Sequence, residues 1–305
     1  MARDVLSFAE ELTVRTDECE IILGEYMRSH TSFRIGGTAE IFCRPRSEEA
    51  LLLCLEQARQ QDFPVTVLGA GSNVLVGDRG IRGVVLDMTG LSDLRQEGNR
   101  LIAQAGTLLT VLSRRAAEAG LSGLEFASGI PGTLGGGIFM DAGAYGGAME
   151  QVVKSARVLG RDGWIRELEA AELELSYRHS RLMETGELLL SAELELVPGD
   201  REEILARMRE FNEKRREKQP LELPSAGSTF KRPAGDFAGR LIEASGLKGF
   251  AMGRAAVSAK HAGFVVNLGG ASAAEVLALC REVQARVKAD SGVELELEVQ
   301  LLGEF

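Results

Sequence analysis

Metal-binding residue types are scarce in this chain. Its 305 residues include three histidines (His30, His179 and His261) and four cysteines, and no two cysteines form a C-x-x-C pair. Zinc sites and disulfide frameworks both need such residues at recognisable spacings. We therefore expect no disulfide framework and no dedicated metal site.

Long apolar runs and an excess of positive charge are also missing. No stretch approaches the roughly 20 apolar residues that cross a bilayer. The N-terminal segment is acidic and lacks the basic-then-apolar order of an export signal. There are 35 basic and 45 acidic residues, a formal net charge of −10. These features disfavour nucleic-acid and membrane partners and predict a cytoplasmic protein.

Glycine, by contrast, is concentrated in residues 129–147, GIPGTLGGGIFMDAGAYGG, where eight of the nineteen residues are glycine. Bulky apolar residues, among them Leu134 and Ile138, lie between the glycines and indicate a packed segment. Glycine allows positive φ and close backbone approach. We expect a rigid loop whose main-chain amides face a phosphorylated ligand. A tight connection between strands is the alternative, and this run alone does not decide between them.

A second glycine-rich turn, LGAGSNVLVGD at 68–78, follows a short buried strand predicted at 65–68. The turn lacks the third glycine of a dinucleotide fingerprint and the Lys-Ser/Thr of a phosphate loop. With Ser72 and Asn73 as additional donors, it fits a pyrophosphate held by main-chain amides. An ordinary strand-to-loop turn is the alternative.

Two polar segments contain candidate proton donors or anion clamps. Ser228 lies in PSAGSTFKRP (224–233) without Asp and His partners nearby, so it is a candidate proton donor rather than part of a serine-hydrolase triad. Taken alone, this segment is better explained as a capped turn. Arg178, in YRHSR (177–181), has the geometry to clamp a carboxylate or phosphate. A surface charge explains Arg178 equally well.

Three glutamates alternate with apolar residues near the C-terminus. Glu294, Glu296 and Glu298 fall within a strand predicted at 293–302, so all three would share one face. A solvated face is the simplest interpretation for any one of them.

Helical and strand patterns alternate along the whole chain. A composition shift at 198–200 predicts a domain boundary there, and Ser272 with Glu275 predicts a capping box. The expected helices are 47–61, 108–119, 201–218, 237–244 and one opened by Ser272 that continues to 287. The expected strands are 65–68, 83–86, 152–159, 188–197, 264–266 and 293–302.

Eight blocks occur in one order along nearly the whole chain. They are TSFRIGG (31–37), LGAGSNVLV-D-GIRGVV (68–85), LEFASGIPGTLGGGIFMDAGAYGG (124–147), SYRHS (176–180), KQPLELPSAGSTFKRP (218–233), LIEASGLKG (241–249), VSAKHAGFVVN (257–267) and GVELELEV-LLG (292–303). In this order they resemble one family, UDP-N-acetylenolpyruvoylglucosamine reductase (MurB), a flavoenzyme of bacterial cell-wall synthesis. The short run between Tyr177 and the 224–233 block resembles its compact subtype, which lacks an extra insertion.

The resemblance implies an α+β fold with a vanillyl-alcohol-oxidase-type FAD-binding region of two subdomains and a C-terminal α+β substrate-binding domain. It places the FAD-binding region at 1–200, divided near 90, and the substrate domain at 201–305, with the last strand packing back toward the FAD region. It also implies a monomer that uses FAD, with NADPH as co-substrate. The implied reaction converts UDP-N-acetylglucosamine enolpyruvate to UDP-N-acetylmuramate in peptidoglycan synthesis, by hydride from flavin N5 and a proton from Ser228.

The resemblance also assigns roles to residues. Ser228 would donate the proton, while Arg178 and a protonated Glu298 would stabilise the enolate-like intermediate. A neutral Glu298 requires a pKa raised by burial or by neighbouring carboxylates. The implied substrate contacts are Tyr145 and Lys218, and the implied cofactor contacts are Arg34, Gly69, Ala70, Gly71, Ser72, Asn73, Ser128, Gly129, Pro131, Gly132, Thr133 and Gly136.

The chain departs from the family pattern at two positions. Asp141 and Arg232 both stand where the family usually has asparagine. An ionised Asp141 beside a flavin would make reduction harder. Two rival functions remain open from the sequence: a flavin oxidase acting on an alcohol, and a flavin or nucleotide-sugar sensor without chemistry. The family's substrate-domain blocks argue against the first, and the presence of all three assigned residues argues against the second.

Overall fold

The computed structural model describes residues 4–305, which divide into two compact units. Unit 1 contains the chain up to Arg44, then Ala50–Leu86 and Arg216–Phe305. Unit 2 contains Pro45–Glu49 and Asp87–Arg215. The predicted boundary at 200 separates an FAD region from a substrate domain and stays a prediction. The packing units are divided differently, since residues 201–215 pack with unit 2.

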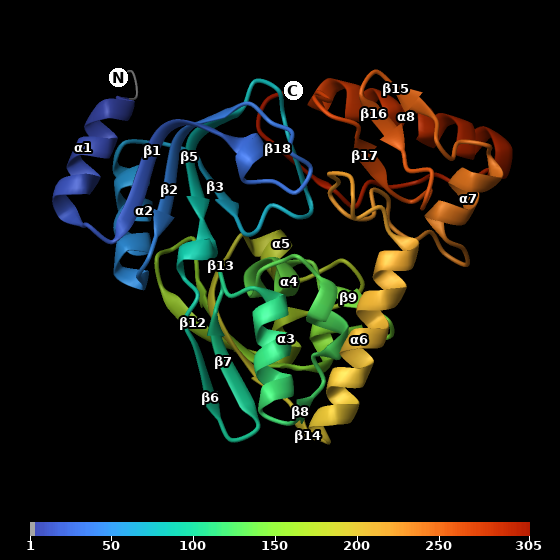
Figure 1. The fold of residues 1–305 in the computed structure, drawn as a ribbon. Helices are drawn as coiled ribbons and strands as arrows, with labels where there is room; N and C mark the ends of the chain where they lie inside the picture. The colour runs from blue at the N-terminus through green and yellow to red at the C-terminus, as the bar shows by residue number, and fades with distance from the viewer. Residues whose placement is uncertain (1–3) are drawn as a thin grey trace. The chain divides into compact units, whose positions relative to one another are not determined.

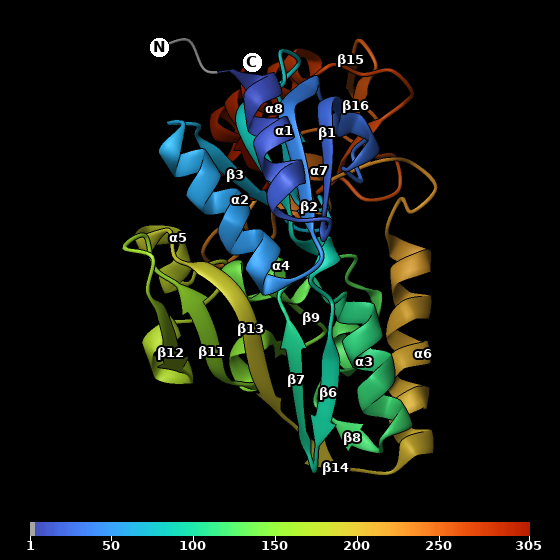
Figure 2. The same cartoon turned by 90° about the vertical axis from the view of Figure 1, so that its left-hand side faces the viewer.

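The N-terminal part of unit 1 is a sheet with two helices along one face (Figures 1 and 2). The strand order is β1-β2-β5-β3, and β2 runs parallel to β5. Phe8 and Leu12 on the first helix and Leu51 on the second are fully buried, so apolar burial holds the helices to the unit. The elements are α1 (Val5–Arg15), β1 (Cys19–Tyr26), β2 (Thr38–Pro45), α2 (Glu48–Gln60), β3 (Val65–Leu68) and β5 (Ile81–Asp87).

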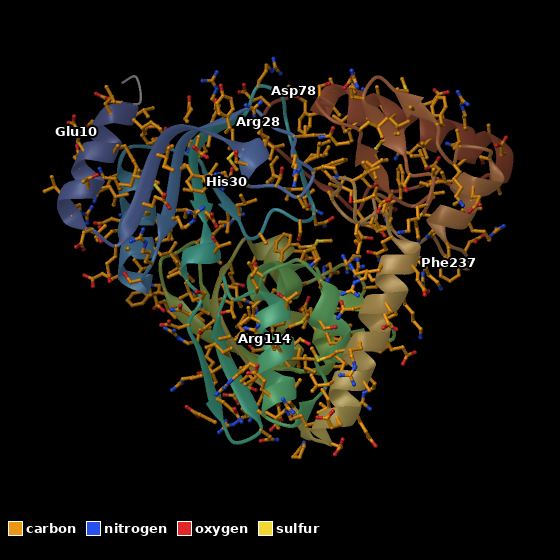
Figure 3. The ribbon with its side chains drawn as sticks, in the orientation of Figure 1. Glu10, Arg28, His30, Asp78, Arg114 and Phe237 are labelled. Carbon is orange, nitrogen blue, oxygen red and sulfur yellow. The ribbon has the colours of Figure 1, made fainter. Side chains whose placement is uncertain are left out.

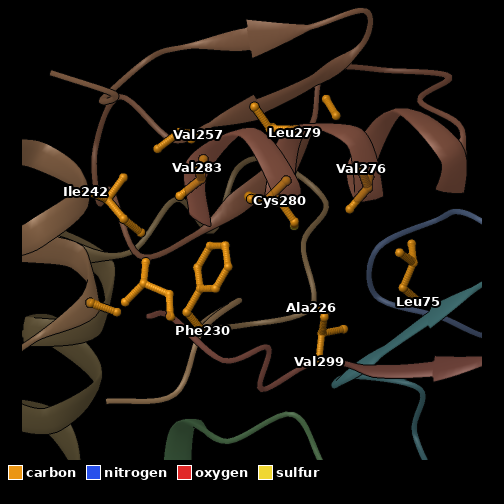
Figure 4. Close-up of a cluster of buried hydrophobic side chains, with 14 of the residues drawn as sticks. Leu75, Ala226, Phe230, Ile242, Val257, Val276, Leu279, Cys280, Val283 and Val299 are labelled. Carbon is orange, nitrogen blue, oxygen red and sulfur yellow. The ribbon is translucent and has the colours of Figure 1, made fainter. Parts of the chain in front are cut away.

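The C-terminal part of unit 1 shares a core with the chain near Leu75. Phe230, Ile242 and Val283 belong to this core, which Figure 4 shows beneath the longest helix. Each such side chain contributes roughly 1.5–3 kcal/mol on burial. The elements are β4 (Val74–Val76), α7 (Ala238–Ala244), β15 (Ala251–Met252), β16 (Ala255–Val257), β17 (Val265–Asn267), α8 (Ala273–Ser291) and β18 (Gln300–Leu302).

The last strand joins the two parts of unit 1. β18 pairs in parallel with β4, so residues 300–302 lie beside residues 74–76. The chain therefore returns to the glycine-rich turn that precedes β4.

Unit 2 is built on an antiparallel sheet with the order β12-β11-β13-β7-β6, with α3 and α4 on one face (Figure 1). Its strands are β6 (Leu94–Glu97), β7 (Arg100–Gln104), β8 (Leu121–Ser122), β9 (Gly143–Ala144), β10 (Gly147–Ala148), β11 (Val153–Leu159), β12 (Ile165–Glu169), β13 (Leu188–Glu195) and β14 (Val197–Pro198). Its helices are α3 (Leu109–Glu118), α4 (Leu134–Phe139), α5 (Arg181–Thr185) and most of α6 (Arg201–Lys218). Short 3₁₀ turns include η1 (Met27–Ser29) in unit 1 and η3 (Glu125–Gly129) in unit 2.

Most predicted elements are confirmed within one or two residues, including the capping box at Ser272 and Glu275. The strand predicted at 293–302 is wrong over its first seven residues, because only Gln300–Leu302 is a strand. Residues 293–299 follow the alternating pattern but have no continuous partner strand, and Leu297 makes only an isolated bridge to Phe230.

The predicted loop at 129–147 is wrong in one respect, since it contains the helix α4. Thr133 caps this helix by accepting a hydrogen bond from the Gly136 amide at 3.3 Å. Leu134 and Ile138 are fully buried, so tertiary packing offsets the roughly 1 kcal/mol that each helical glycine costs. The prediction that the run is packed is confirmed.

Candidate functional site: a cofactor cradle and a buried carboxyl

The turn at 69–73 presents a row of unused main-chain donors. Within residues 4–305, the amides of Ala70, Gly71, Ser72 and Asn73 donate no hydrogen bond to the protein. The turn follows β3 directly, so the strand's end fixes where these donors lie. Consecutive amides of this kind form a concave anion site. The residues present therefore fit the pyrophosphate of a dinucleotide.

Gly71 fixes the turn against the segment before β2. Its φ is +61°, and a Cβ there would lie 2.0 Å from the His30 carbonyl oxygen. The Ser32 amide donates to the Gly71 carbonyl at 3.0 Å. His30, labelled in Figure 3, packs its ring against Phe42 with ring centroids 4.3 Å apart. Only glycine satisfies both the positive φ and this close approach.

Arg34 lies on the segment that supports this turn. It is exposed, with φ +56°, and its amide donates to the Thr31 carbonyl at 3.1 Å. Asn267 of β17 donates from Nδ2 to the Phe33 carbonyl at 3.1 Å, which ties the segment to the C-terminal part of unit 1. The backbone around Arg34 is therefore fixed while its guanidinium faces solvent.

Asn73 connects the turn to Glu298. Its Nδ2 donates to the Glu298 carbonyl at 3.2 Å, and its own carbonyl accepts from the Gln300 amide at 2.9 Å. These bonds continue the pairing of β4 with β18. The predicted cofactor turn and the predicted catalytic glutamate thus share one hydrogen-bonded framework.

Glu298 differs from the two glutamates that precede it. Glu294 and Glu296 are exposed and pair with lysines, whereas Glu298 is 8% exposed. A solvated position, the simplest interpretation of each glutamate taken alone, is confirmed for Glu294 and Glu296 and is wrong for Glu298. The cause is the irregular backbone of 293–299, which buries Glu298 and the adjacent Val299 together.

Ser228 lies beside Glu298 through backbone pairing. The Glu298 amide donates to the Thr229 carbonyl at 2.8 Å, and the Lys231 amide donates to the Glu296 carbonyl at 2.9 Å. Gly227 before it has φ +73°, and the Thr229 hydroxyl accepts from the Val265 amide. In residues 4–305 the half-buried Ser228 hydroxyl makes no hydrogen bond to protein, which leaves it available to a ligand.

Lys218 ends α6 and is exposed. Its positive charge acts on His261. Burial lowers the pKa of His261, and the positive charges of Lys248 and Lys218 lower that pKa further. The lysine is therefore an exposed cation at the start of the segment that carries Ser228.

The second predicted cofactor segment, in unit 2, offers fewer free donors than expected. The amides of Leu134 and Gly135 donate to the carbonyls of Thr107 and Ala105, and that of Gly136 donates to the Thr133 hydroxyl. Among the described residues, the amides of Gly132 and Thr133 donate to no protein acceptor. Pro131 is exposed beside them. The donors thus lie before α4 rather than along its first turn.

Helix α6 supports this segment, which the sequence did not indicate. Asn212 donates to the Ser128 hydroxyl at 3.2 Å, and a Cβ on Gly129 would lie 2.8 Å from the Asn212 amide oxygen and 3.0 Å from Arg215 Cδ. Burial lowers the pKa of Arg215. The sequence pattern suggested only a solvated face for the charges of this helix, and no sequence signal separated Arg215 from the other cations.

Tyr145 packs against the same helix, α6. It is 43% exposed, has φ +54°, and stacks on Phe211 with ring centroids 4.7 Å apart and planes 9° apart. The stack fixes the ring while one face of the side chain remains open.

Arg178 lies at the tip of a tight turn. Ser176 and His179 exchange two backbone hydrogen bonds, and Arg178 between them has φ +57°. Its Nη1 donates to the Asp141 carbonyl at 3.4 Å. Burial raises the pKa of the Asp141 carboxyl, as does nearby Glu150, whereas Arg178 lowers it. Asp141 has φ +40°, a conformation that Asp and Asn both tolerate, so the backbone accommodates either residue here.

The comparisons with known proteins agree with this geometry. A family profile described as "FAD binding domain" matches residues 39–169, and "UDP-N-acetylenolpyruvoylglucosamine reductase, C-terminal domain" matches 219–302. A reductase of that name from Agathobacter rectalis is 48% identical over 98% of this chain and 99% of its own length. The chain belongs to the UDP-N-acetylenolpyruvoylglucosamine reductase family. The resemblance to this family is confirmed, and the compact subtype stays a prediction.

Two other relatives extend the match. The reductase of Clostridium tetani is 49% identical over 92% of this chain and 91% of its own length. The crystal structure of the Thermus caldophilus enzyme, MurB, superposes with a TM-score of 0.80 at 37% identity, covering 93% of this chain and 98% of that one. The α+β fold with an FAD-binding region of the vanillyl-alcohol-oxidase type and a MurB C-terminal domain is thereby confirmed, as is FAD as the cofactor. Between residues 4 and 305, no helix is both long and apolar enough for a membrane span.

Proposed function

We propose that this chain reduces the enolpyruvyl group of UDP-N-acetylglucosamine enolpyruvate to UDP-N-acetylmuramate, with FAD as cofactor and NADPH as reductant, in peptidoglycan synthesis. Membership of the reductase family supports the reaction. One observation in the structure supports the residue roles most directly. Glu298 is a buried carboxyl tied by backbone bonds to both the cofactor turn and the Ser228 segment.

The amides of 70–73, fixed by Gly71, would hold the cofactor's pyrophosphate in unit 1. The resemblance also implies cofactor contacts at Gly132 and Thr133, whose amides donate to no acceptor among the described residues. FAD, when bound, carries reducing equivalents from NADPH to the substrate as hydride. The protein's contribution is to hold this group and to bind and protonate the substrate.

Glu298 would stabilise negative charge on the substrate carboxylate. A protonated carboxyl donates a hydrogen bond, and donors fixed in advance in a water-poor site stabilise developing charge strongly. Hydrogen bonds at the Glu298 amide and carbonyl fix the backbone from which this side chain extends. The Arg178 guanidinium, held at the tip of its turn, would pair with the same carboxylate through two parallel bonds.

Ser228 would supply the proton. Its hydroxyl is half-buried and makes no hydrogen bond to the described protein, so the Oγ proton is available to the substrate carbon next to the carboxylate. General acids of this kind contribute roughly 10²–10⁴-fold. Tyr145 and Lys218 would contact the substrate, and the exposed Arg34 would contact the cofactor.

Removal of the Ser228 hydroxyl tests the proton-donor role. In Ser228→Ala, NADPH should reduce the flavin at the wild-type rate, while reoxidation by the enolpyruvyl substrate should slow by about 10²–10⁴-fold. The control is Ser225→Ala, three residues earlier on the same segment. Stopped-flow absorbance follows both half-reactions. Equal slowing of both in Ser228→Ala, or no slowing, would reject the role.

We also infer that the chain acts as a monomer in the cytoplasm. Membership of the reductase family supports the location, and both implied substrates are small molecules. Light scattering after gel filtration should give a mass near 32.8 kDa for the FAD-loaded protein. A mass of twice that value would reject the monomer.

A further inference from the structure

Three of the four cysteines meet in unit 1, on elements that contribute no residue to the proposed reaction. Cys19 begins β1, Cys43 lies in β2 and Cys54 lies in α2. Their sulfur atoms all lie within 4.8 Å of one another, and those of Cys19 and Cys54 are 3.5 Å apart. None of the three is part of a disulfide bond. Because they are far apart in the sequence, spacing rules do not find them.

The sulfur positions suit one shared ion. Three thiolates, each about 2.3 Å from a common ion at tetrahedral angles, lie about 3.8 Å from each other. The observed separations, 3.5 Å between the sulfurs of Cys19 and Cys54 and none above 4.8 Å, lie on either side of that spacing. No histidine or carboxylate of the described residues belongs to the group, so its donor set is three sulfurs. Such a set selects soft, thiophilic ions.

Charge balance narrows the choice of ion. Cys43 and Cys54 are fully buried in the interior of unit 1. A net charge left in this interior would be costly. The neighbouring cation, Arg44, is already paired with Glu20 at 2.6 Å. Three thiolates leave two negative charges with a monovalent ion and one with a divalent ion, but none with a trivalent ion.

We propose that Cys19, Cys43 and Cys54 form a binding site for a trivalent thiophilic metalloid, arsenic(III), held as a neutral tris-thiolate. Arsenous acid, As(OH)₃, exchanges its three hydroxyl groups for the three thiols. Three As–O bonds break and three As–S bonds form, and the thiol protons leave in three water molecules. No oxidation state changes, so no further reactant is needed. The partly exposed Cys19 provides the point of entry.

Two other chemistries suit the cluster less well. Zinc in structural sites takes four ligands, and the described residues offer three here. Oxidation to a disulfide joins only two of the three sulfurs, and it needs an oxidant that arsenous acid binding does not need. An ion bound to all three sulfurs would join β1, β2 and α2, and so would favour the folded state over the unfolded chain.

The test uses the full-length reduced protein, with its FAD, and inorganic arsenite. Native mass spectrometry should show one arsenic per chain, and arsenic X-ray absorption should show a first shell of three sulfurs. The thermal unfolding midpoint should rise with arsenite. Cys19→Ser should weaken binding at least tenfold. Cys280→Ala, which removes the buried cysteine of the C-terminal core, should bind as the wild type does.

Several outcomes would overturn the proposal. They are a shell of two sulfurs, full affinity in Cys19→Ser, loss of binding in Cys280→Ala, or stoichiometric zinc binding without arsenite binding. Circular dichroism confirms that each variant folds. Cys54→Ala is the second variant, and it too should lose the three-sulfur shell. None of these readouts depends on enzyme activity.

Discussion

Glu298 is the residue on which the proposed chemistry depends most. The residue is 8% exposed, while Glu296, two residues earlier, is exposed and pairs with Lys231. The sequence pattern treats both alike, because both are acidic residues at alternate positions. In the structure they differ in burial, because the backbone between them is irregular, and the alternating sequence pattern does not predict this irregularity.

A pair of substitutions tests this distinction. Glu298→Ala removes a fixed hydrogen-bond donor and should slow flavin reoxidation by substrate by about 10²–10³-fold. Glu298→Gln keeps a hydrogen-bond donor and should slow this reoxidation less than Glu298→Ala does. Glu296→Ala serves as the matched control and should react as the wild type does. Stopped-flow absorbance measures the rate of reoxidation in each variant. A wild-type rate in Glu298→Ala would reject the role of Glu298 as a hydrogen-bond donor to the substrate.

Asp141 predicts a pH dependence of stability. Because burial raises the pKa of its carboxyl, the folded chain binds this proton more tightly than the unfolded chain does. Stability is therefore lost as pH rises from the ordinary Asp pKa of about 3.9 through the higher folded value. Asp141→Asn has no charge to bury and should be more stable at pH 7.

Denaturant unfolding at several pH values measures this effect. The advantage of Asp141→Asn should shrink as pH falls below about 4, where the aspartate is protonated in both states. An advantage that does not vary with pH would contradict the account. The same variant tests the sequence-based hypothesis about the flavin, since an unchanged midpoint potential would show that Asp141 does not oppose reduction.

At the scale of elements, helix α8 has an unusually complete N-terminal cap. Ser272 and Glu275 form a capping box, and the Asp78 carboxylate accepts from the amides of Ala273 and Ala274 at 2.7 and 3.0 Å. Asp78, labelled in Figure 3, comes from the loop after β4. The cap therefore fastens the C-terminal helix to the segment that carries the cofactor turn.

Asp78→Ala should lower the free energy of unfolding by about 0.5–2 kcal/mol, because two helix amides lose their acceptor. Asp290→Ala, at the exposed opposite end of the same helix, should be neutral or slightly stabilising, since an acid there opposes the helix dipole. Urea unfolding of both variants gives the comparison. Equal losses would show that the Asp78 contact does not act as a cap.

The cofactor turn gives a prediction about glycine. Gly71 and Gly98 both have φ +61°, but a Cβ on Gly71 meets the His30 carbonyl while one on Gly98 meets nothing within 4 Å. Gly71→Ala combines backbone strain with a clash and should weaken FAD binding by at least about tenfold. Gly98→Ala carries only the strain and should keep FAD. Titration of each apoprotein with FAD measures both affinities, and equal affinities would contradict the role of the turn.

The helices and strands also show which elements can be predicted from the sequence. Helices such as 201–218 and the capping box of α8 follow from local patterns, and the structure has both. Residues 293–302 have a strand pattern yet form a strand only at the end, because the strand state depends on a partner. The helix in the glycine-rich run depends on acceptors at Ala105 and Thr107, which no local rule supplies.

At the scale of the whole molecule, the sequence predicted the family, the fold class and the cofactor, because eight ordered blocks constrain them together. It did not predict the convergence of Cys19, Cys43 and Cys54, or the support that Asn212 gives to Ser128. Both depend on contacts between segments far apart in the chain. The assigned roles of Arg178, Ser228 and Glu298 stay predictions until variants are measured.

The most direct test of the central claim is the visible spectrum of the FAD-loaded chain through one anaerobic cycle. Oxidised protein should show flavin bands, and one equivalent of NADPH should bleach them. Addition of UDP-N-acetylglucosamine enolpyruvate should restore them with formation of UDP-N-acetylmuramate. A colourless protein that does not take up FAD, or a reduced flavin that the enolpyruvyl substrate does not reoxidise, would contradict the account.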